Sequence, residues 1–160
     1  MSELPSVARG DSAPTDPEVV QRYLHRHIPI SQQMGVRVIA VEPAGVTLCA
    51  PLIPNLNHEA TAFGGSISAL AILAGWTQVY ARLWSITEPR RIVIQRSAVQ
   101  YLAPIVGEFC ATATAPRHDE WERFLAQLDK RGKSRIAIRV DVLSNGVRAA
   151  AFEGDYVAVR

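Results

Sequence analysis

The residues best suited to chemistry lie in the segment from Asn55 to Trp76, NLNHEATAFGGSISALAILAGW. Gly64 and Gly65 stand where polar turn residues give way to an uncharged, alanine-rich run. A helix that begins there presents unpaired backbone N–H groups and the positive end of its dipole, and glycines let a ligand approach the backbone. Such a helix start can hold a carbonyl oxygen and stabilise an oxyanion. A tight loop before a helix, capped near Ser66, explains the same residues, so both interpretations stay open at this point.

Four polar side chains around this glycine pair are candidates for proton transfer and substrate contact. His58 or Glu59 would serve as a general base for water if its side chain points inward. Thr61 and Ser66 would hydrogen-bond the substrate or the water. A solvated loop explains His58 and Glu59 as well, and turn or cap chemistry explains Thr61 and Ser66. His58 has no Cys, His or Asp at metal-ligand spacing, so we expect no metal and no cofactor.

The run that follows the glycines carries no charged residue between Glu59 and Arg82, and its apolar residues occupy every face of a helix. A helix that is apolar all round is buried. We therefore predict a helix from about Gly65 to Leu83, enclosed by the rest of the protein. The stretch is long enough to cross a membrane, but its glycine, serine, threonine and glutamine residues and the lack of a basic flank argue against a membrane span.

Alternation of apolar and polar residues predicts six strands. Their ranges are 36–42, 46–53, 91–102, 106–115, 135–143 and 147–159, with turns at 43–45, 87–90 and 144–146. Pro51 and Pro54 indicate that the second strand is frayed or lies at a sheet edge. Gly154 in the last strand is a candidate β-bulge.

Two more helices are expected outside the buried one. Asp16 and Pro17 are typical of an N-cap and a first helical residue, so a short helix begins there and ends at Pro29. The period of the apolar residues predicts an amphipathic helix from Asp119 to Lys130. In that helix Asp119 and Glu122 resemble a capping box.

Together these elements predict an α+β fold in which an antiparallel sheet of about six strands wraps around one long central helix. Residues 1–16 are rich in Pro, Ser and Asp and are expected to form a flexible leader. Residues 17–160 are expected to form a single domain, because a chain of this length typically holds one core.

Composition and charge limit which binding partners and which cellular compartment we expect. The 160 residues carry a net charge of +2 and no run of five or more Lys or Arg, so nucleic acid and an acidic membrane are not expected partners. The N-terminus lacks the apolar stretch of a secretory signal, so we expect a cytoplasmic protein. Two cysteines, Cys49 and Cys110, do not make a disulfide framework, and we expect both to be buried and reduced.

The spacing in NHEATAFGG, residues 57–65, resembles the Asn-x-x-Gly-x-x-His-Gly-Gly motif of the hotdog-fold acyl-CoA thioesterases. More closely, the stretches PNLNHEATAFGGSISALAILAGW, YLAPIVGEF and FEGDYVA resemble the putative thioesterase domain at the C-terminus of YiiD-type proteins. The resemblance covers about residues 28–159. It implies a hotdog fold and the hydrolysis of an acyl thioester, carried by coenzyme A or by an acyl carrier protein.

The resemblance also implies roles for individual residues. Asn57 matches the asparagine that helps to hold the thioester or the attacking water, and Gly64 matches the glycine whose N–H polarises the thioester carbonyl. Phe63 stands where the motif has its histidine. The family's catalytic carboxylate, nine residues later, falls at Ile72, and the predicted helix holds no acid. The standard mechanism, with a carboxylate on the helix, is therefore in doubt for this chain.

Hotdog proteins are typically dimers with the thioester site between protomers, so the resemblance implies a homodimer or a dimer of dimers. Gln95, Ser97 and Tyr101 share one face of the predicted strand 91–102 and would reach the helix start of a neighbour, where Phe63 and Gly65 would contact the substrate. Arg90–Arg91 or Arg96 would attract the phosphates of the thioester's handle, although a solvated charged face explains these arginines as well.

Three functions remain open on this evidence. The first is a thioesterase that activates water near Asn57 and holds the oxyanion at Gly64. The second is a module that binds acyl thioesters without turnover, which the missing helix carboxylate favours. The third is an enoyl-thioester dehydratase, which normally needs a histidine with an acid and is disfavoured by Phe63. A catalytic base at Glu59 or His58 separates the first from the second.

Overall fold

The computed structural model describes residues 15–84 and 91–160. Most of the predicted leader and the turn predicted at 87–90 lie outside these residues. The first helix begins at Pro17 as predicted, with Asp16 as its N-cap, and the Asp16 carboxylate accepts the N–H of Glu18 at 2.9 Å. That bond satisfies one of the helix's unpaired donors.

The described residues form four α-helices, one short 3₁₀ turn and six strands, and the strands follow one another in pairs along the chain. The bounds are α1 Pro17–His27, α2 Pro29–Gln33, β1 Arg37–Glu42, β2 Gly45–Ala50, the 3₁₀ turn Ile53–Asn55, α3 Gly64–Trp84, β3 Arg91–Tyr101, β4 Phe109–Thr114, α4 His118–Arg131, β5 Lys133–Ser144 and β6 Val147–Val159. All pairings are antiparallel, in the order β1-β2-β4-β5-β6-β3.

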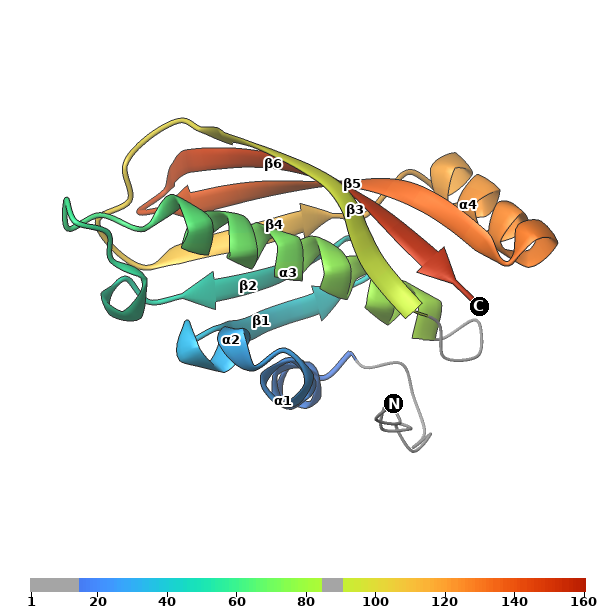
Figure 1. Cartoon of the computed structure of the whole chain (residues 1–160), viewed down its shortest axis with the longest axis horizontal. Coiled ribbons are helices and arrows are strands. Elements are labelled where there is room, and N and C mark those ends of the chain that lie inside the picture. Colours follow the sequence, from blue (N-terminus) through green and yellow to red (C-terminus); the bar gives the residue numbers. More distant parts are fainter. Residues whose placement is uncertain (1–14, 85–90) are drawn as a thin grey trace.

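The sheet curves around α3, which runs along its concave side (Figure 1). Helix α3 packs against five strands, namely β2, β3, β4, β5 and β6. On β2 the inward residues Val46, Leu48 and Ala50 are fully buried, as the alternation predicted. The predicted hotdog fold, with an enclosed helix that is uncharged up to Arg82, is therefore confirmed.

Helix α3 approaches the sheet closely at Gly75. The Tyr156 hydroxyl donates to the carbonyl of Ile72 at 2.8 Å, and Tyr156 is fully buried. A Cβ on Gly75 would lie 2.3 Å from that hydroxyl oxygen, so only glycine fits beneath this ring. A small residue in the middle of α3 thus lets the tyrosine anchor the helix to β6.

Aromatic residues cover a side of α3 that faces α1. Trp76 and Tyr80 stack on each other with ring centroids 4.7 Å apart, and Tyr23 of α1 stacks on Tyr80 at 4.9 Å. The Trp76 indole N–H donates to the carbonyl of Ile92 at 3.0 Å. The Trp76 side chain therefore packs between α1, α3 and β3.

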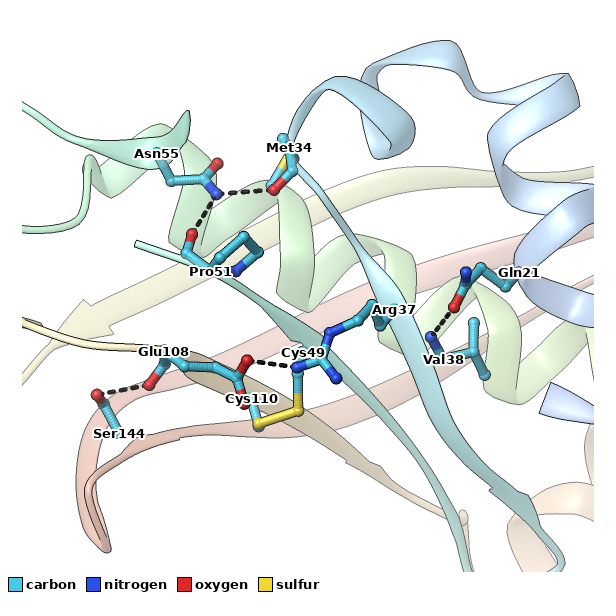
Figure 2. A network of polar contacts seen from close by, with 10 residues as sticks. All are labelled: Gln21, Met34, Arg37, Val38, Cys49, Pro51, Asn55, Glu108, Cys110 and Ser144. Atoms are coloured by element: carbon cyan, nitrogen blue, oxygen red, sulfur yellow. Dashed lines mark hydrogen bonds and ion pairs between the residues drawn. A yellow bond between two sulfur atoms is a disulfide. The ribbon is translucent and has the colours of Figure 1, made fainter. Parts of the chain in front are cut away.

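The prediction of reduced cysteines is wrong. Cys49 and Cys110 are directly opposite each other on β2 and β4, and a disulfide joins them (Figure 2). The two residues are 61 positions apart in sequence but have Cα atoms 4.0 Å apart. Their proximity comes from the strand register, which the spacing of two cysteines in sequence does not reveal.

Two smaller predictions, on the second strand and on Gly154, also need correction. Strand β2 ends at Ala50, before the two prolines, and lies between β1 and β4 rather than at an edge. No register shift occurs at Gly154; the shifts lie in β1 between Val38 and Ala40, in β3 between Ile94 and Arg96, and in the pairing of β5 with β6 between Val142 and Leu143.

The start of α4 also differs from the prediction. The acidic side chain that reaches back at this helix start is Glu120, which accepts the N–H of Arg117 at 3.1 Å, because α4 begins one residue earlier than expected. Among the helices of the described ranges, none is both long and apolar enough to cross a membrane.

Candidate active site at the start of helix α3

The first two residues of α3 leave backbone donors free. The N–H groups of Ser66 and Ile67 both donate to the carbonyl of Phe63, at 2.9 and 3.1 Å. Within residues 15–84 and 91–160, the N–H groups of Gly64 and Gly65 have no hydrogen-bond acceptor. Unpaired donors are intrinsic to a helix start, and at these two glycines no side chain caps them.

Three hydrogen bonds fix the chain that leads into this helix. The N–H of Phe63 donates to the carbonyl of Asn55 at 2.7 Å, and the N–H of Ala62 donates to the carbonyl of Ile105 at 2.9 Å. The Tyr101 hydroxyl at the end of β3 donates to the carbonyl of Gly64 at 3.0 Å. The free N–H groups are therefore held in place by segments from three parts of the chain.

A hollow of about 360 Å³ opens beside Gly64. Its walls are mainly apolar and come from the start of α3 and from the segment that follows β3. The lining residues are Ala62, Gly64, Ile67, Tyr101, Leu102, Ala103, Pro104 and Ile105. The volume lies in the usual range for small-molecule sites, and the free donor of Gly64 is at its wall.

The carboxamide of Asn57 is used within its own loop. Its Oδ1 accepts the N–H groups of Glu59 and Thr61, at 2.9 and 3.1 Å, and its Nδ2 donates to the Thr61 hydroxyl at 2.9 Å. These bonds stabilise a tight turn in which Ala60 has a φ of 59°. Asn57 and Thr61 thus shape the loop, and one N–H of Asn57 Nδ2 has no partner among these bonds.

His58 and Glu59 lie at the exposed tip of this loop. Their side chains are 86% and 74% exposed, and His58 Nε2 is 3.3 Å from a Glu59 carboxylate oxygen. Neither residue lines the hollow beside Gly64. In the described structure the two candidate bases therefore contact each other and solvent.

Phe63 and Gly65 form a close pair at the helix start. The Phe63 side chain is 56% exposed, and a Cβ on Gly65 would lie 2.3 Å from its ring. Gly65 is therefore needed for the ring to lie across the first turn. Ser66 is half-buried in that turn and does not line the hollow.

The three residues predicted on one face of β3 lie in different surroundings. Tyr101 lines the hollow beside Gly64, whereas Gln95, at the bulge, lines a second hollow near the start of β5. Ser97 is exposed and lines neither. The bulge shifts the alternation along β3, and Gln95 and Tyr101 line different hollows.

Sequence reasoning missed the structural role of Asn55. It is 2% exposed, and its Nδ2 donates to the carbonyls of Met34 and Pro51, at 2.9 and 2.7 Å (Figure 2). These bonds join the loop before α3 to the turn before β1. A polar residue in a turn-rich stretch carries no sequence signal that distinguishes burial from exposure.

One group of potential metal ligands exists in the described part of the chain. Cys49, Cys110 and Glu108 bring their sulfur and oxygen atoms within 4.8 Å of one another. Both sulfurs are joined in the disulfide, so neither is a thiolate that could bind a metal. The Glu108 carboxylate is instead paired with Arg37.

Comparison with known proteins gives the family. Residues 18–160 match the model of a family described as putative thioesterase (yiiD_Cterm). A protein of unknown function from Chlorobaculum tepidum TLS is 28% identical with a TM-score of 0.86, over 94% of this chain and 99% of that one. A putative thioesterase from Shewanella oneidensis is 26% identical with a TM-score of 0.80, over 90% and 97%.

A probable thioesterase from Pseudomonas aeruginosa, at 20% identity and a TM-score of 0.76, covers 92% of this chain and 99% of its own and shows the same fold. The family model spans both the helix start and the sheet that encloses it. The chain belongs to the putative thioesterase family defined by the C-terminal domain of YiiD.

Proposed function

We propose that this protein hydrolyses an acyl thioester of coenzyme A or of an acyl carrier protein to a free acid and a thiol. The observation that carries the proposal is the pair of acceptor-free N–H groups at Gly64 and Gly65, one of them at the wall of an apolar hollow. Preorganised backbone donors of this kind stabilise the oxyanion formed in acyl transfer. Membership of the thioesterase family supports the same reaction class.

The reaction would proceed through a tetrahedral intermediate. The thioester carbonyl oxygen accepts the N–H of Gly64, and a water attacks the carbonyl carbon while a base takes one of its protons. The negative charge moves onto the carbonyl oxygen, where the N–H groups and the positive end of the α3 dipole stabilise it. The C–S bond then breaks, and the thiolate leaves and regains a proton.

Glu59 is the proposed base, with Asn57 holding the water through its remaining N–H. Helix α3 offers no alternative, because its only charged residue is Arg82 near its C-terminal end. The exposure of Glu59 in one protomer means that a second protomer, or the substrate itself, has to cover the loop for this role.

A second copy of the chain is the proposed partner. Strand β3 is at an edge of the sheet, so one side of its backbone has no neighbouring strand in the described residues. Its Val93 side chain is 54% exposed and that of Tyr101 55%. Antiparallel pairing of two β3 strands would cover this edge and bring a second protomer toward the helix start.

Two substitutions at one position test the oxyanion role. Gly64 is the first residue of α3, a position where proline is well tolerated, and its N–H makes no bond that proline would break. Gly64→Pro therefore deletes the proposed donor with little effect on folding. Gly64→Ala is the matched control, because it keeps the N–H and its Cβ would meet Tyr101 at an ordinary 3.4 Å.

The assay is release of free thiol from acyl-CoAs of increasing chain length, with thermal unfolding of each variant as a check on the fold. We expect Gly64→Pro to lower kcat about 10²- to 10³-fold, the effect of losing one oxyanion donor, and Gly64→Ala to retain most of the activity. Equal kcat values for Gly64→Pro and wild type would refute the oxyanion role.

A binding module without turnover is the second candidate. The exposure of His58 and Glu59 favours it, since neither residue contacts the hollow in one protomer. In this case a thioether analogue of acyl-CoA, which cannot be hydrolysed, would bind to wild type while no acyl-CoA or acyl carrier protein released thiol.

A further inference from the structure

Asn55 is a buried polar residue at the beginning of the loop that leads into α3. It is 2% exposed, and its Nδ2 donates to the carbonyls of Met34 and Pro51 at 2.9 and 2.7 Å, as Figure 2 shows. Its Oδ1 has no donor among the described residues. A buried oxygen without a donor costs stability, so the two donated bonds are what an asparagine contributes at this position.

The backbone of Asn55 is bonded on both sides as well. Its N–H donates to the carbonyl of Leu52 at 2.9 Å, and its carbonyl accepts the N–H of Phe63 at 2.7 Å. Between Asn55 and Phe63, residues Leu56 and Ala62 form an antiparallel bridge. The segment is therefore a short hairpin closed by the bond between Asn55 and Phe63. The Asn55 side chain joins the base of this hairpin to the end of α2 and to the end of β2.

The hairpin ends at the peptide unit that carries the proposed oxyanion donor. The carbonyl of Phe63 and the N–H of Gly64 belong to one planar, trans peptide unit and point in opposite directions. That carbonyl accepts the N–H groups of Ser66 and Ile67, and the N–H of Phe63 is held by Asn55. The direction of the Gly64 N–H is thus fixed by the first turn of α3 on one side and by Asn55 on the other.

We propose that Asn55 is a positioning residue for the oxyanion donor at Gly64. Its carboxamide fixes the hairpin to the body of the protein, and its carbonyl passes this constraint through Phe63 to the Gly64 N–H. The inference rests on the proposed function, because it assigns the constraint to an oxyanion held at Gly64. Asn55 is not among the residues that line the hollow beside Gly64, so it acts through Phe63 and not by contact with the substrate.

Two other bonds hold the same segment and limit the expected effect. The N–H of Ala62 donates to the carbonyl of Ile105, and the Tyr101 hydroxyl donates to the carbonyl of Gly64. Neither bond involves the peptide unit between Phe63 and Gly64. Loss of the Asn55 carboxamide should therefore loosen that unit while the helix start stays folded.

The test variant is Asn55→Ala, which removes both side-chain bonds and keeps the backbone carbonyl. Asn55→Ser, which retains one hydroxyl donor, takes its place if thermal unfolding shows that Asn55→Ala does not fold. The matched control is Gln21→Ala. It removes a carboxamide that accepts the N–H of Val38 at 3.0 Å, a bond between α1 and β1 that does not involve the helix start (Figure 2).

The kinetic measurement is a double-mutant cycle of Asn55→Ala with Gly64→Pro, on the acyl-CoA that wild type hydrolyses fastest. We expect Asn55→Ala to lower kcat about 10- to 100-fold and to leave the Kd of a thioether analogue unchanged, because a displaced donor weakens binding of the transition state. In the Gly64→Pro background the same substitution should change kcat less than about 3-fold, since the donor is already absent. Gln21→Ala should keep the kcat of wild type.

A second measurement needs no turnover. In protein labelled with ¹⁵N-glycine, the amide signal of Gly64 is identified by its loss in Gly64→Ala. We expect Asn55→Ala to shift this signal in the ¹H–¹⁵N spectrum and Gln21→Ala to leave it in place. A shift of the signal would report a reoriented peptide unit whether or not the protein hydrolyses any thioester.

An equal loss of kcat in the wild-type and Gly64→Pro backgrounds, an unchanged kcat in Asn55→Ala or an unchanged Gly64 signal would each overturn the proposal. If the signal shifts but wild type cleaves no acyl-CoA, the positioning of this N–H by Asn55 stands and the hydrolysis fails. If wild type cleaves acyl-CoA and Gly64→Pro lowers kcat while Asn55→Ala does not, the hydrolysis stands and the positioning role fails.

Discussion

Loss of the Cys49–Cys110 disulfide should destabilise the protein substantially. The bond closes a chain segment with a sequence separation of 61 residues. Cross-linking a loop of that length lowers the chain entropy of the unfolded state, by about 4 kcal/mol at 25 °C in the loop-closure treatment. For a protein of this size 1 kcal/mol corresponds to about 2–4 °C in melting temperature, so reduction should lower Tm by about 8–16 °C.

The measurement compares circular-dichroism melting curves of oxidised protein, protein reduced with a phosphine, and the variant Cys49→Ala/Cys110→Ala. Titration of free thiols in denaturant should find none before reduction and two after it. The double variant should melt near the reduced protein and should not respond to the reductant. Thr47→Ala is the matched control, because it removes a hydroxyl contact of 3.1 Å to Thr112 between the same two strands without a covalent bond.

Thr47→Ala should lower the free energy of unfolding by at most about 1 kcal/mol, the usual contribution of a cross-strand pair. Two free thiols in untreated protein, or equal Tm values for oxidised and reduced protein, would refute the argument. A reduced protein that melts no lower than the Thr47→Ala variant would show that the unfolded chain gains little freedom from reduction.

Two further predictions concern Tyr156 and the aromatic residues near α1. Gly75→Ala should destabilise the fold by about 1–3 kcal/mol through overpacking, since its Cβ would lie 2.3 Å from the Tyr156 hydroxyl, and Gly75→Ala/Tyr156→Phe should recover part of that loss in urea unfolding. Burial raises the pKa of Tyr156, Tyr80 and Tyr23, above the value of about 10 found in an unfolded chain. The unfolded state therefore releases these protons first, and the free energy of unfolding should hold up to about pH 10 and fall above it. Absorbance at 295 nm should show these tyrosines ionising only with unfolding.

Sequence patterns predicted the elements whose signal is local. The uncharged run gave α3 to within one residue at each end, and alternation along 135–143 gave the core of β5, with Ile138 and Val140 inward. The hairpin at Asn145 and Gly146 also follows from the two residues, which have φ values of 50° and 75° as the turn requires. In each case the pattern depends on neighbours in sequence.

Features that depend on strand pairing escaped prediction. The disulfide requires Cys49 and Cys110 to be in register across two strands. The bulge at Gln95 depends on how β3 pairs with β6, and the assignment to Gly154 failed because glycine also serves close packing: a Cβ there would lie 2.7 Å from the Phe152 ring. A single sequence contains no direct record of these tertiary pairings.

The candidate site also contains features that the sequence predicts and features that depend on the tertiary fold. Donors at the start of a helix follow from helix geometry, so Gly64 and Gly65 were identifiable from sequence. Asn57 was expected to hold water, and its carboxamide is engaged by its own loop, as Asx turns typically are. Which of two nearby asparagines is buried depends on the turn before β1, which only the folded structure brings to Asn55.

Helix α3 carries no acidic residue. The contribution of the oxyanion donors to kcat and that of the general base can therefore be measured separately. A stabilised oxyanion contributes about 10²- to 10³-fold and a positioned general base about 10²- to 10⁴-fold. If Glu59 is the base, Glu59→Gln should lower kcat by the second factor and leave the binding of a thioether analogue unchanged. A normal kcat in Glu59→Gln beside a low kcat in Gly64→Pro would mean that catalysis comes from polarisation of the thioester alone. Loss of activity in both variants would require the exposed loop tip at His58 and Glu59 to close over the thioester, because an exposed carboxylate cannot reach water at the carbonyl.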